Sequence, residues 1–155
     1  MNTEFQTKLS ELRKKIGNHN VMTFSTCAEN RVTSRQMSVV AVDGNFYCQT
    51  SENFLKYKQI IQNSNVALCF KNFSIEGVCS DVGKPADGSN ASVLKAIKKY
   101  FPLAYKSYSF LSEERLLKIV PIFVYSWNYE FTKPYMEFWD MRRFTYLKEY
   151  KDISV

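Results

Sequence analysis

Residues able to bind an anion are predicted to meet around position 50. Thr50 and Ser51 stand between a strand-forming run and a segment of helical periodicity, which makes either of them a natural N-cap of that helix. A helix N-terminus attracts phosphate through its free N–H groups and its dipole. Lys56, about one turn inside the helix, can reach back to such a phosphate, and Arg35 on a neighbouring strand carries the fork geometry that suits phosphate oxygens. The same residues also fit a structural role, in which the hydroxyls only cap, Lys56 is solvated and Arg35 pairs with a carboxylate.

Other chemistries find little support in the residue types. The four cysteines show no C-x-x-C pair and no zinc-site spacing; they are Cys27, Cys48, Cys69 and Cys79. His19 is the single histidine, which excludes a multi-histidine metal site, and its loop-like setting predicts a surface residue. No side chain stands out as a general acid or base, which argues against a hydrolase.

Helical periodicity appears in several segments. Phe5, Leu9, Leu12 and Ile16 form one apolar stripe, and Gly17 follows as a C-terminal stop. Further helices are predicted over Ser51–Asn63, from a cap at Ser89 or Asn90 to Phe101, where Pro102 closes the helix, and from Ser112-Glu113-Glu114 onward.

Alternating apolar residues predict strands between these helices. The runs are Val21–Ala28, Arg31–Val42, Asn45–Thr50, Val66–Phe70, Phe73–Cys79 and Ile119–Trp127. Asp43-Gly44 favours a type I′ turn, so Arg35–Val42 is expected to pair antiparallel with Asn45–Thr50. Gly77 suggests a bulge or a close backbone approach. The tail from Phe131 carries no clear pattern.

This order predicts a mainly β protein, a β-barrel of about six antiparallel strands with peripheral helices. The 155 residues (18.1 kDa) suit a single domain over residues 1–155. No apolar run is long enough to span a membrane and the start lacks a signal pattern, so a cytoplasmic location is expected. The net charge of +6 is scattered over the chain, and without an aromatic–basic strand motif nucleic-acid binding ranks last among the possible functions.

From His19 to about Gly77 the sequence resembles the FMN-binding split barrels of the pyridoxamine 5′-phosphate oxidase-like superfamily, nearest to the general stress protein and nitroimidazole-reductase-like branches. The matching segments are Arg35-Gln36-Met37-Ser38-Val39-Val40, the Asp43-Gly44 hairpin, Phe46-Tyr47-Cys48-Gln49-Thr50-Ser51, a lysine-bearing helix, Asn63-Ser64-Asn65-Val66-Ala67-Leu68 and Ile75-Glu76-Gly77. The family pattern Thr-Ser-x-x-Ser-Arg-Lys becomes Thr50-Ser51-Glu52-Asn53-Phe54-Leu55-Lys56. The lysine stays, but one phosphate-binding arginine and one hydroxyl are replaced by Phe54 and Leu55.

The resemblance implies a homodimer with FMN at the subunit interface and hydride transfer between NAD(P)H and a small acceptor, such as a quinone or a nitro compound. It assigns no catalytic residue, and its cofactor-binding residues are Arg35, Gln36, Met37, Ser38, Gln49, Thr50, Ser51, Lys56 and Trp127. The alternatives are a non-catalytic flavin-binding or stress-related protein and a deazaflavin or haem ligand. The oxidase's own C-terminal arginine–histidine pattern is absent, so that specific activity is not expected.

Overall fold

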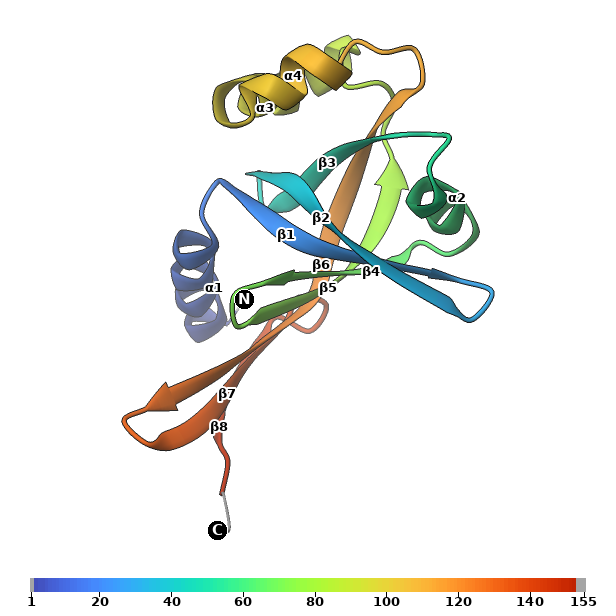
Figure 1. The fold of residues 1–155 in the computed structure, drawn as a ribbon. Helices are drawn as coiled ribbons and strands as arrows, with labels where there is room; N and C mark the ends of the chain where they lie inside the picture. Colours follow the sequence, from blue (N-terminus) through green and yellow to red (C-terminus); the bar gives the residue numbers. More distant parts are fainter. Residues whose placement is uncertain (1, 153–155) are drawn as a thin grey trace.

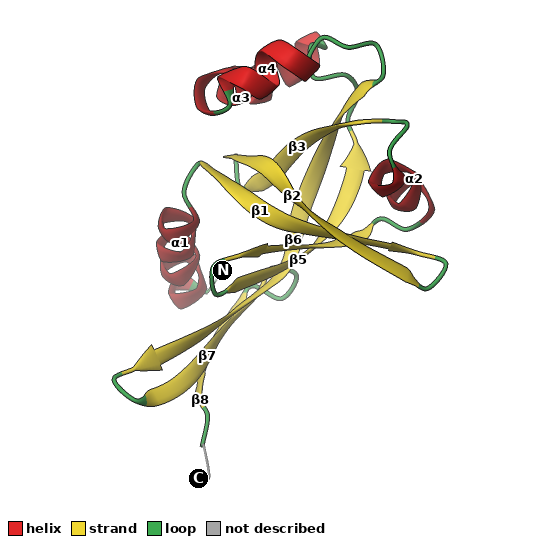
Figure 2. Ribbon diagram, viewed as in Figure 1, coloured by secondary structure: helices red, strands yellow, loops and turns green. Residues whose placement is uncertain are grey.

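A computed structural model describes residues 2–152 and shows one antiparallel sheet curled into a barrel (Figure 1). The strand order is β3-β2-β1-β4-β5-β6-β7-β8, and an additional β3–β6 pairing closes the first six strands on themselves. The last two strands extend the sheet beyond the barrel, and the helices lie outside it (Figure 2). The predicted mainly β barrel of about six strands is therefore confirmed.

The elements have the following bounds. The helices are α1 (Thr3–Ile16), α2 (Leu55–Gln62), the 3₁₀ turn η1 (Gly88–Asn90), α3 (Ala91–Tyr100) and α4 (Pro102–Tyr108). The strands are β1 (His19–Ala28), β2 (Arg31–Val42), β3 (Asn45–Ser51), β4 (Asn65–Phe70), β5 (Phe73–Asp81), β6 (Glu114–Glu130), β7 (Lys133–Asp140) and β8 (Thr145–Tyr150). No described helix is long and apolar enough to cross a membrane.

The main core fills the barrel and is closed at one end by α1. The predicted stripe of this helix is buried, as are its barrel partners, which include Phe24, Leu68, Ile75 and Ile119. The Asn2 side chain caps α1 by accepting from the backbone N–H groups of its first turn, and Gly17 ends it with φ at +78°. A second, smaller cluster lies under α3, where Val93 and Ile97 pack on the outside of β2 and β6.

Strands β2 and β3 separate soon after the turn that joins them. Asp43 and Gly44 have φ values of +51° and +80°, which confirms the left-handed turn, but only residues 40–42 of β2 pair with residues 45–47 of β3. Beyond this point β2 pairs only with β1, while β3 pairs with the start of β6 as far as Ser51↔Glu114. The predicted pairing over Arg35–Val42 was wrong for most of its length, because β6 competes for the hydrogen-bonding edge of β3.

The barrel also depends on a close approach at Gly77. The register of β5 against β6 shifts between Glu76 and Gly77. A Cβ atom on Gly77 would lie 2.6 Å from Ile119 Cγ2 and 3.1 Å from the Val120 carbonyl oxygen. Both the predicted bulge and the predicted close backbone approach are therefore confirmed.

Several element boundaries differ from the sequence predictions. Ser112-Glu113-Glu114 does not begin a helix; Glu114 begins β6, because the edge of β3 offers this segment backbone partners. Pro102 does not end the helical region but takes the first turn of α4, where its missing N–H is no loss. The tail after Phe131 forms β7 and β8, whose pattern is hidden because both faces of this extension carry aromatic and charged residues.

Candidate cofactor site

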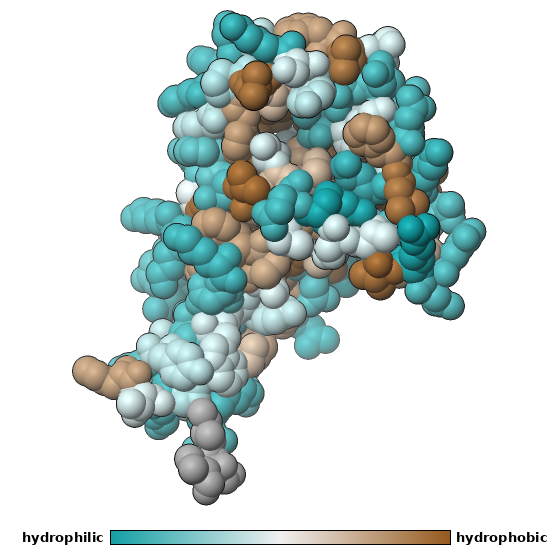
Figure 3. Space-filling model, viewed as in Figure 1, coloured by the Kyte–Doolittle hydropathy of each residue, from teal (hydrophilic) through white to brown (hydrophobic). Residues whose placement is uncertain are grey.

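A pocket of about 390 Å³ lies where β2 and β3 separate, within the range of roughly 300–1,000 Å³ that is usual for small-molecule sites. Its lining comes from β2, from the end of β3, from the turn into α2, from the segment after α4 and from the start of β6: Met37, Gln49, Thr50, Ser51, Asn53, Phe54, Lys56, Tyr108, Leu111, Glu113 and Glu114. The fold thus brings together five predicted site residues, which are Met37, Gln49, Thr50, Ser51 and Lys56. In the space-filling view, hydrophobic side chains gather beside α2 and along the helices at the top, on either side of a hollow (Figure 3).

Thr50 and Ser51 belong to β3 and do not cap the helix, which corrects the prediction. Helix α2 begins at Leu55 with Phe54 in the N-cap position and no side-chain capping bond. The N–H of Asn53 donates to Ser51 Oγ at 3.1 Å, so a turn separates the strand from the helix. Thr50 is 3% exposed, and its Oγ1 has no hydrogen-bond partner among the described residues. A buried hydroxyl left without a partner is unfavourable, so this wall of the pocket is completed by a group that the chain does not supply.

Lys56 brings a positive charge to the pocket. It is half-buried in the first turn of α2, and its Nζ lies 4.8 Å from the centre of the Phe54 ring. None of the ion pairs found in residues 2–152 includes Lys56. Burial lowers the pKa of Lys56, and the Arg35 guanidinium lowers it further. Two unneutralised cations therefore act on one region, as an anion site requires.

Arg35 is anchored by neutral oxygen atoms. Its guanidinium donates to the Phe24 carbonyl at 3.2 Å, to Thr26 Oγ1 at 2.9 Å and to Thr33 Oγ1. Both threonine hydroxyls donate to Gln59 Oε1 at 2.6 Å, which connects β1, β2 and α2. The carboxylate pairing considered from the sequence is not present in this part of the chain, and burial lowers the pKa of Arg35. Arg35 lies beside the pocket rather than in its wall.

Glu114 is a wall residue that the sequence interpretation missed. It is 4% exposed, and burial together with the neighbouring Glu113 raises its pKa to about 7, although Lys56 acts in the opposite direction. The signal was hidden because the Glu-Glu pair resembles a helix start. Only the register that places Glu114 opposite Ser51 brings its carboxyl group to the site.

Three predicted residues on β2 and β3 have other environments. Gln36 lies on the exposed face of β2 and donates to Thr23 Oγ1 at 2.8 Å. Ser38 lines a neighbouring depression formed with α3 and α4, which shares Tyr108 with the site. Gln49 lines the pocket, but its amide also donates to the Ala104 carbonyl at 3.2 Å and accepts from Ser109 Oγ at 2.8 Å.

Trp127 lies away from the pocket of its own chain. It stands near the far end of β6 from Glu114, up to roughly 40 Å along a strand that rises about 3.3 Å per residue. It is 40% exposed and makes an edge contact with Tyr129, with ring centres 6.0 Å apart. His19, exposed as predicted, stacks on Tyr100 at 4.1 Å and is absent from the pocket lining.

The thiols and carboxylates provide no metal site. No group of three or more His, Cys, Asp or Glu side chains in residues 2–152 is arranged to hold a metal ion. Burial raises the pKa of Cys48 to about 12, so this thiol stays protonated inside the barrel.

No protein-family model and no curated protein matches this sequence. Solved structures match its shape. General Stress Protein 26 from Bacillus anthracis superposes with a TM-score of 0.60 at 18% identity, over 79% of this chain and 93% of that one. A putative pyridoxamine 5′-phosphate oxidase from Listeria innocua gives 0.53 at 15% identity, over 78% and 95%. The haem storage protein HutZ from Vibrio cholerae gives 0.60 at 14% identity, over 76% and 89%.

The chain has the split-barrel fold. At these identities the likeness establishes architecture, and it confirms at that level the resemblance stated from the sequence. Proteins that share the split barrel include some that bind haem, so the fold leaves the ligand open.

Proposed function

We propose that this split barrel binds FMN in the pocket between β2 and β3 and uses it to transfer hydride between NAD(P)H and a small acceptor. The observation that carries the proposal is the convergence of Lys56, which has no ion pair, with the partnerless buried hydroxyl of Thr50 in one pocket. A phosphate supplies what both groups lack, since it accepts hydrogen bonds and neutralises the cation.

The residues of the pocket fit a phosphate-bearing cofactor. Lys56, the hydroxyls of Thr50 and Ser51 and the uncapped N-terminus of α2 would hold the phosphate. Glu114 opposes an anion only when it is ionised, and a pKa of about 7 leaves much of it neutral at physiological pH. The bound flavin would supply the hydride chemistry itself.

The remaining lining residues would orient the cofactor and exclude water. Met37 and Leu111 offer apolar surface for a planar ring, and Gln49 is fixed in place by its bonds to the α4 segment. Arg35 would act as a second positive charge held at a set position by Thr26 and Thr33. None of these groups needs to exchange a proton with the substrate, which agrees with hydride transfer as the reaction class.

A second candidate is a haem-binding function, which the haem storage neighbour favours. In this chain the single histidine, His19, is stacked on Tyr100 and does not line the pocket. Burial keeps the Cys48 thiol protonated, which makes it a poor iron ligand. We therefore rank haem, deazaflavin and a flavin protein without turnover below the FMN oxidoreductase.

Titration of the purified protein with FMN, followed by flavin fluorescence, tests the proposal. Lys56→Met is expected to weaken FMN binding by roughly 10- to 100-fold, because a hydrogen bond to a charged group contributes about 1.5–3 kcal/mol. Thr50→Val is expected to weaken FMN binding while leaving the fold at least as stable, since its hydroxyl has no partner to lose. Lys58→Met, an exposed residue of the same helix, is the matched control and is expected to bind FMN like the wild type.

Mass identification of any small molecule that copurifies separates the ligands. Recovered FMN and steady-state reduction of an acceptor by NADH or NADPH support the oxidoreductase. Bound FMN without turnover on quinones or nitro compounds would favour the non-catalytic alternative. A colourless protein that takes up no FMN would overturn the proposal.

A further inference from the structure

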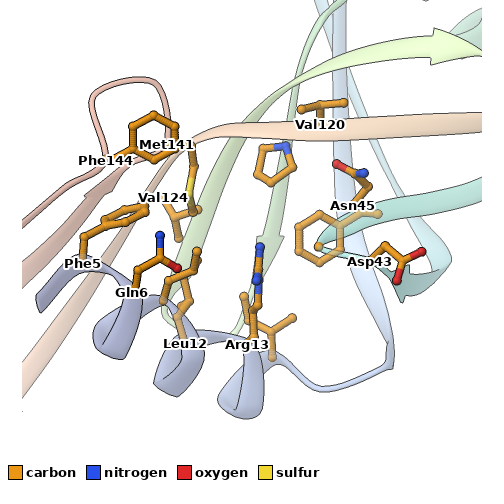
Figure 4. A pocket seen from close by; sticks show the side chains of 15 residues that line it. Phe5, Gln6, Leu12, Arg13, Asp43, Asn45, Val120, Val124, Met141 and Phe144 are labelled. Atoms are coloured by element: carbon orange, nitrogen blue, oxygen red, sulfur yellow. The ribbon is translucent and has the colours of Figure 1, made fainter. Parts of the chain in front are cut away.

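A second pocket, of about 400 Å³, lies between α1 and the barrel (Figure 4). Residues of α1, of the β2–β3 turn, of the bend in β6 and of the β7–β8 turn line it: Phe5, Gln6, Leu9, Leu12, Arg13, Ile16, Asp43, Gly44, Asn45, Phe46, Val120, Pro121, Val124, Met141 and Phe144. It shares no residue with the pocket between β2 and β3. Two separate pockets therefore exist on the two sides of β3.

The floor of this second pocket is apolar. Leu9, Leu12, Ile16 and Val124 are each at most 7% exposed, so their side chains belong to the core, and only one face of each borders the cavity. Phe144 is 49% exposed and stands at the rim. Such a floor favours a hydrocarbon or an aromatic body over a polar ligand.

One cation extends into this apolar space. Arg13 comes from the Arg13-Lys14-Lys15 run, which by itself indicates only a solvated helix face, yet in Figure 4 its side chain rises from α1 into the middle of the pocket. None of the ion pairs or side-chain hydrogen bonds described for residues 2–152 involves its guanidinium. The Asp43 carboxylate shares the lining but lies beyond ion-pair distance, and in Figure 4 its oxygens point away from Arg13.

The hairpin turn leaves room for this arginine. A Cβ on Gly44 would lie 2.6 Å from Arg13 Nη2, so the guanidinium rests against a glycine that has no side chain to displace it. The pocket thus combines a buried apolar floor with a single forked donor at a defined position, and Asn45 adds an amide nearby. This is the complement of a carboxylate attached to an apolar body.

We infer that this pocket binds an organic monocarboxylate with an apolar chain or ring, independently of the cofactor site. The carboxylate pairs with the Arg13 guanidinium, and the apolar part lies on the floor formed by Leu9, Ile16 and Val124. A nucleotide is a poor occupant, because the floor offers nothing to its sugar and phosphates. No covalent step is involved.

Calorimetric titration with sodium decanoate, kept below its micelle concentration, tests the inference. One molecule is expected to bind per chain, and Arg13→Met should weaken binding at least tenfold because it removes the charge and keeps the length of the side chain. Lys14→Met, which removes the same charge one residue away on an exposed position outside the pocket, should bind like the wild type. Decan-1-ol, which has the same chain without the charge, should bind at least tenfold more weakly than decanoate.

Two further results would overturn the inference. One is equal decanoate binding by Arg13→Met and the wild type, and the other is loss of decanoate binding when FMN saturates the protein. A Val120→Trp variant gives a second test, because a larger side chain at this 41% exposed position fills the pocket from its rim and should weaken decanoate binding without unfolding the core. Decanoate binding that survives Val120→Trp unchanged would place the ligand elsewhere.

Discussion

At the scale of single residues, the candidate cofactor site is built from groups whose charges are only partly satisfied. Lys56 and Arg35 lie close enough to lower each other's tendency to stay protonated, and neither has a carboxylate in an ion pair. Glu114 adds a buried carboxyl to the same wall. Its ionisation decides whether the pocket carries two positive charges or a partly cancelled set, so proton uptake at Glu114 and anion binding are linked.

Glu114 is expected to make stability depend on pH between about 4.5 and 7. Its pKa is raised to about 7 in the folded chain, so the unfolded chain ionises first as the pH rises, and the folded state loses relative stability across this interval. Above pH 7 the full penalty applies, at most about 3 kcal/mol at 1.36 kcal/mol for each pKa unit. Glu114→Gln should therefore raise the melting temperature at pH 8 and leave it nearly unchanged at pH 4.

Thermal unfolding of both proteins between pH 4 and 8, measured by circular dichroism, checks this prediction. Glu113→Gln, a change at the neighbouring, more exposed carboxylate, serves as the control and should follow the wild-type profile more closely. Parallel curves for wild type and Glu114→Gln over the whole range would contradict the raised pKa.

At the scale of elements, the turn between β2 and β3 sets both pockets. One lies where these strands separate, and the other lies under the turn itself, against α1. The turn needs left-handed backbone at Asp43 and Gly44, and glycine adopts this conformation without the steric penalty that a Cβ brings. A change in this turn should therefore affect both stability and the position of Arg13.

Gly44→Ala is expected to lower the free energy of unfolding by about 1–2 kcal/mol, which is the cost of a left-handed conformation with a Cβ. The new methyl group must also displace the Arg13 guanidinium, although the end of a flexible side chain can move at little cost. Gly88→Ala is the control, because nothing lies within 4 Å of its added Cβ and its φ is not in the left-handed region. Urea denaturation of the three proteins gives the comparison, and equal losses at both glycines would contradict the argument.

Local patterns predicted most elements, and long-range pairing explains the differences. The α1 stripe, the Asp43-Gly44 turn and the Gly77 bulge each depend on a few neighbouring residues, and each is confirmed. The early helix start at Ser51 and the helix at Ser112 were wrong, because each segment instead pairs with the other across the barrel, with Ser51 opposite Glu114. For the same reason the carboxyl group of Glu114 could not be assigned to the site from the sequence.

At the scale of the whole molecule, the cofactor pocket is bordered by exposed apolar side chains. Phe54, Tyr108 and Leu111 line it and are 56%, 53% and 42% exposed. Exposed apolar groups that gather around a pocket are typical of an interface or a ligand. The homodimer implied by the resemblance remains a prediction, and this rim is the surface where we expect the second subunit. Trp127, distant from the pocket of its own chain, would contribute to a site only through such a partner.

Sedimentation equilibrium is expected to give a mass near twice 18.1 kDa. Phe54→Asp should shift the protein toward the monomer, because it places a charge on the apolar rim. Aspartate is a favourable N-cap for α2, so this change does not harm the helix itself. Phe131→Asp is the matched control on a side chain that is 98% exposed outside the rim, and it should leave the mass unchanged. A wild-type protein that sediments as a monomer at every concentration would contradict the prediction.

The separation of β2 from β3 has a consequence for how a flat molecule enters. The two strands share only the three residue pairs next to their turn, and each finds its remaining partners on its other side. They can therefore spread like the arms of tweezers joined at the turn, with every ladder hydrogen bond of the barrel kept. A wide aromatic ligand can be admitted sideways by this bending alone, without melting any strand of the barrel.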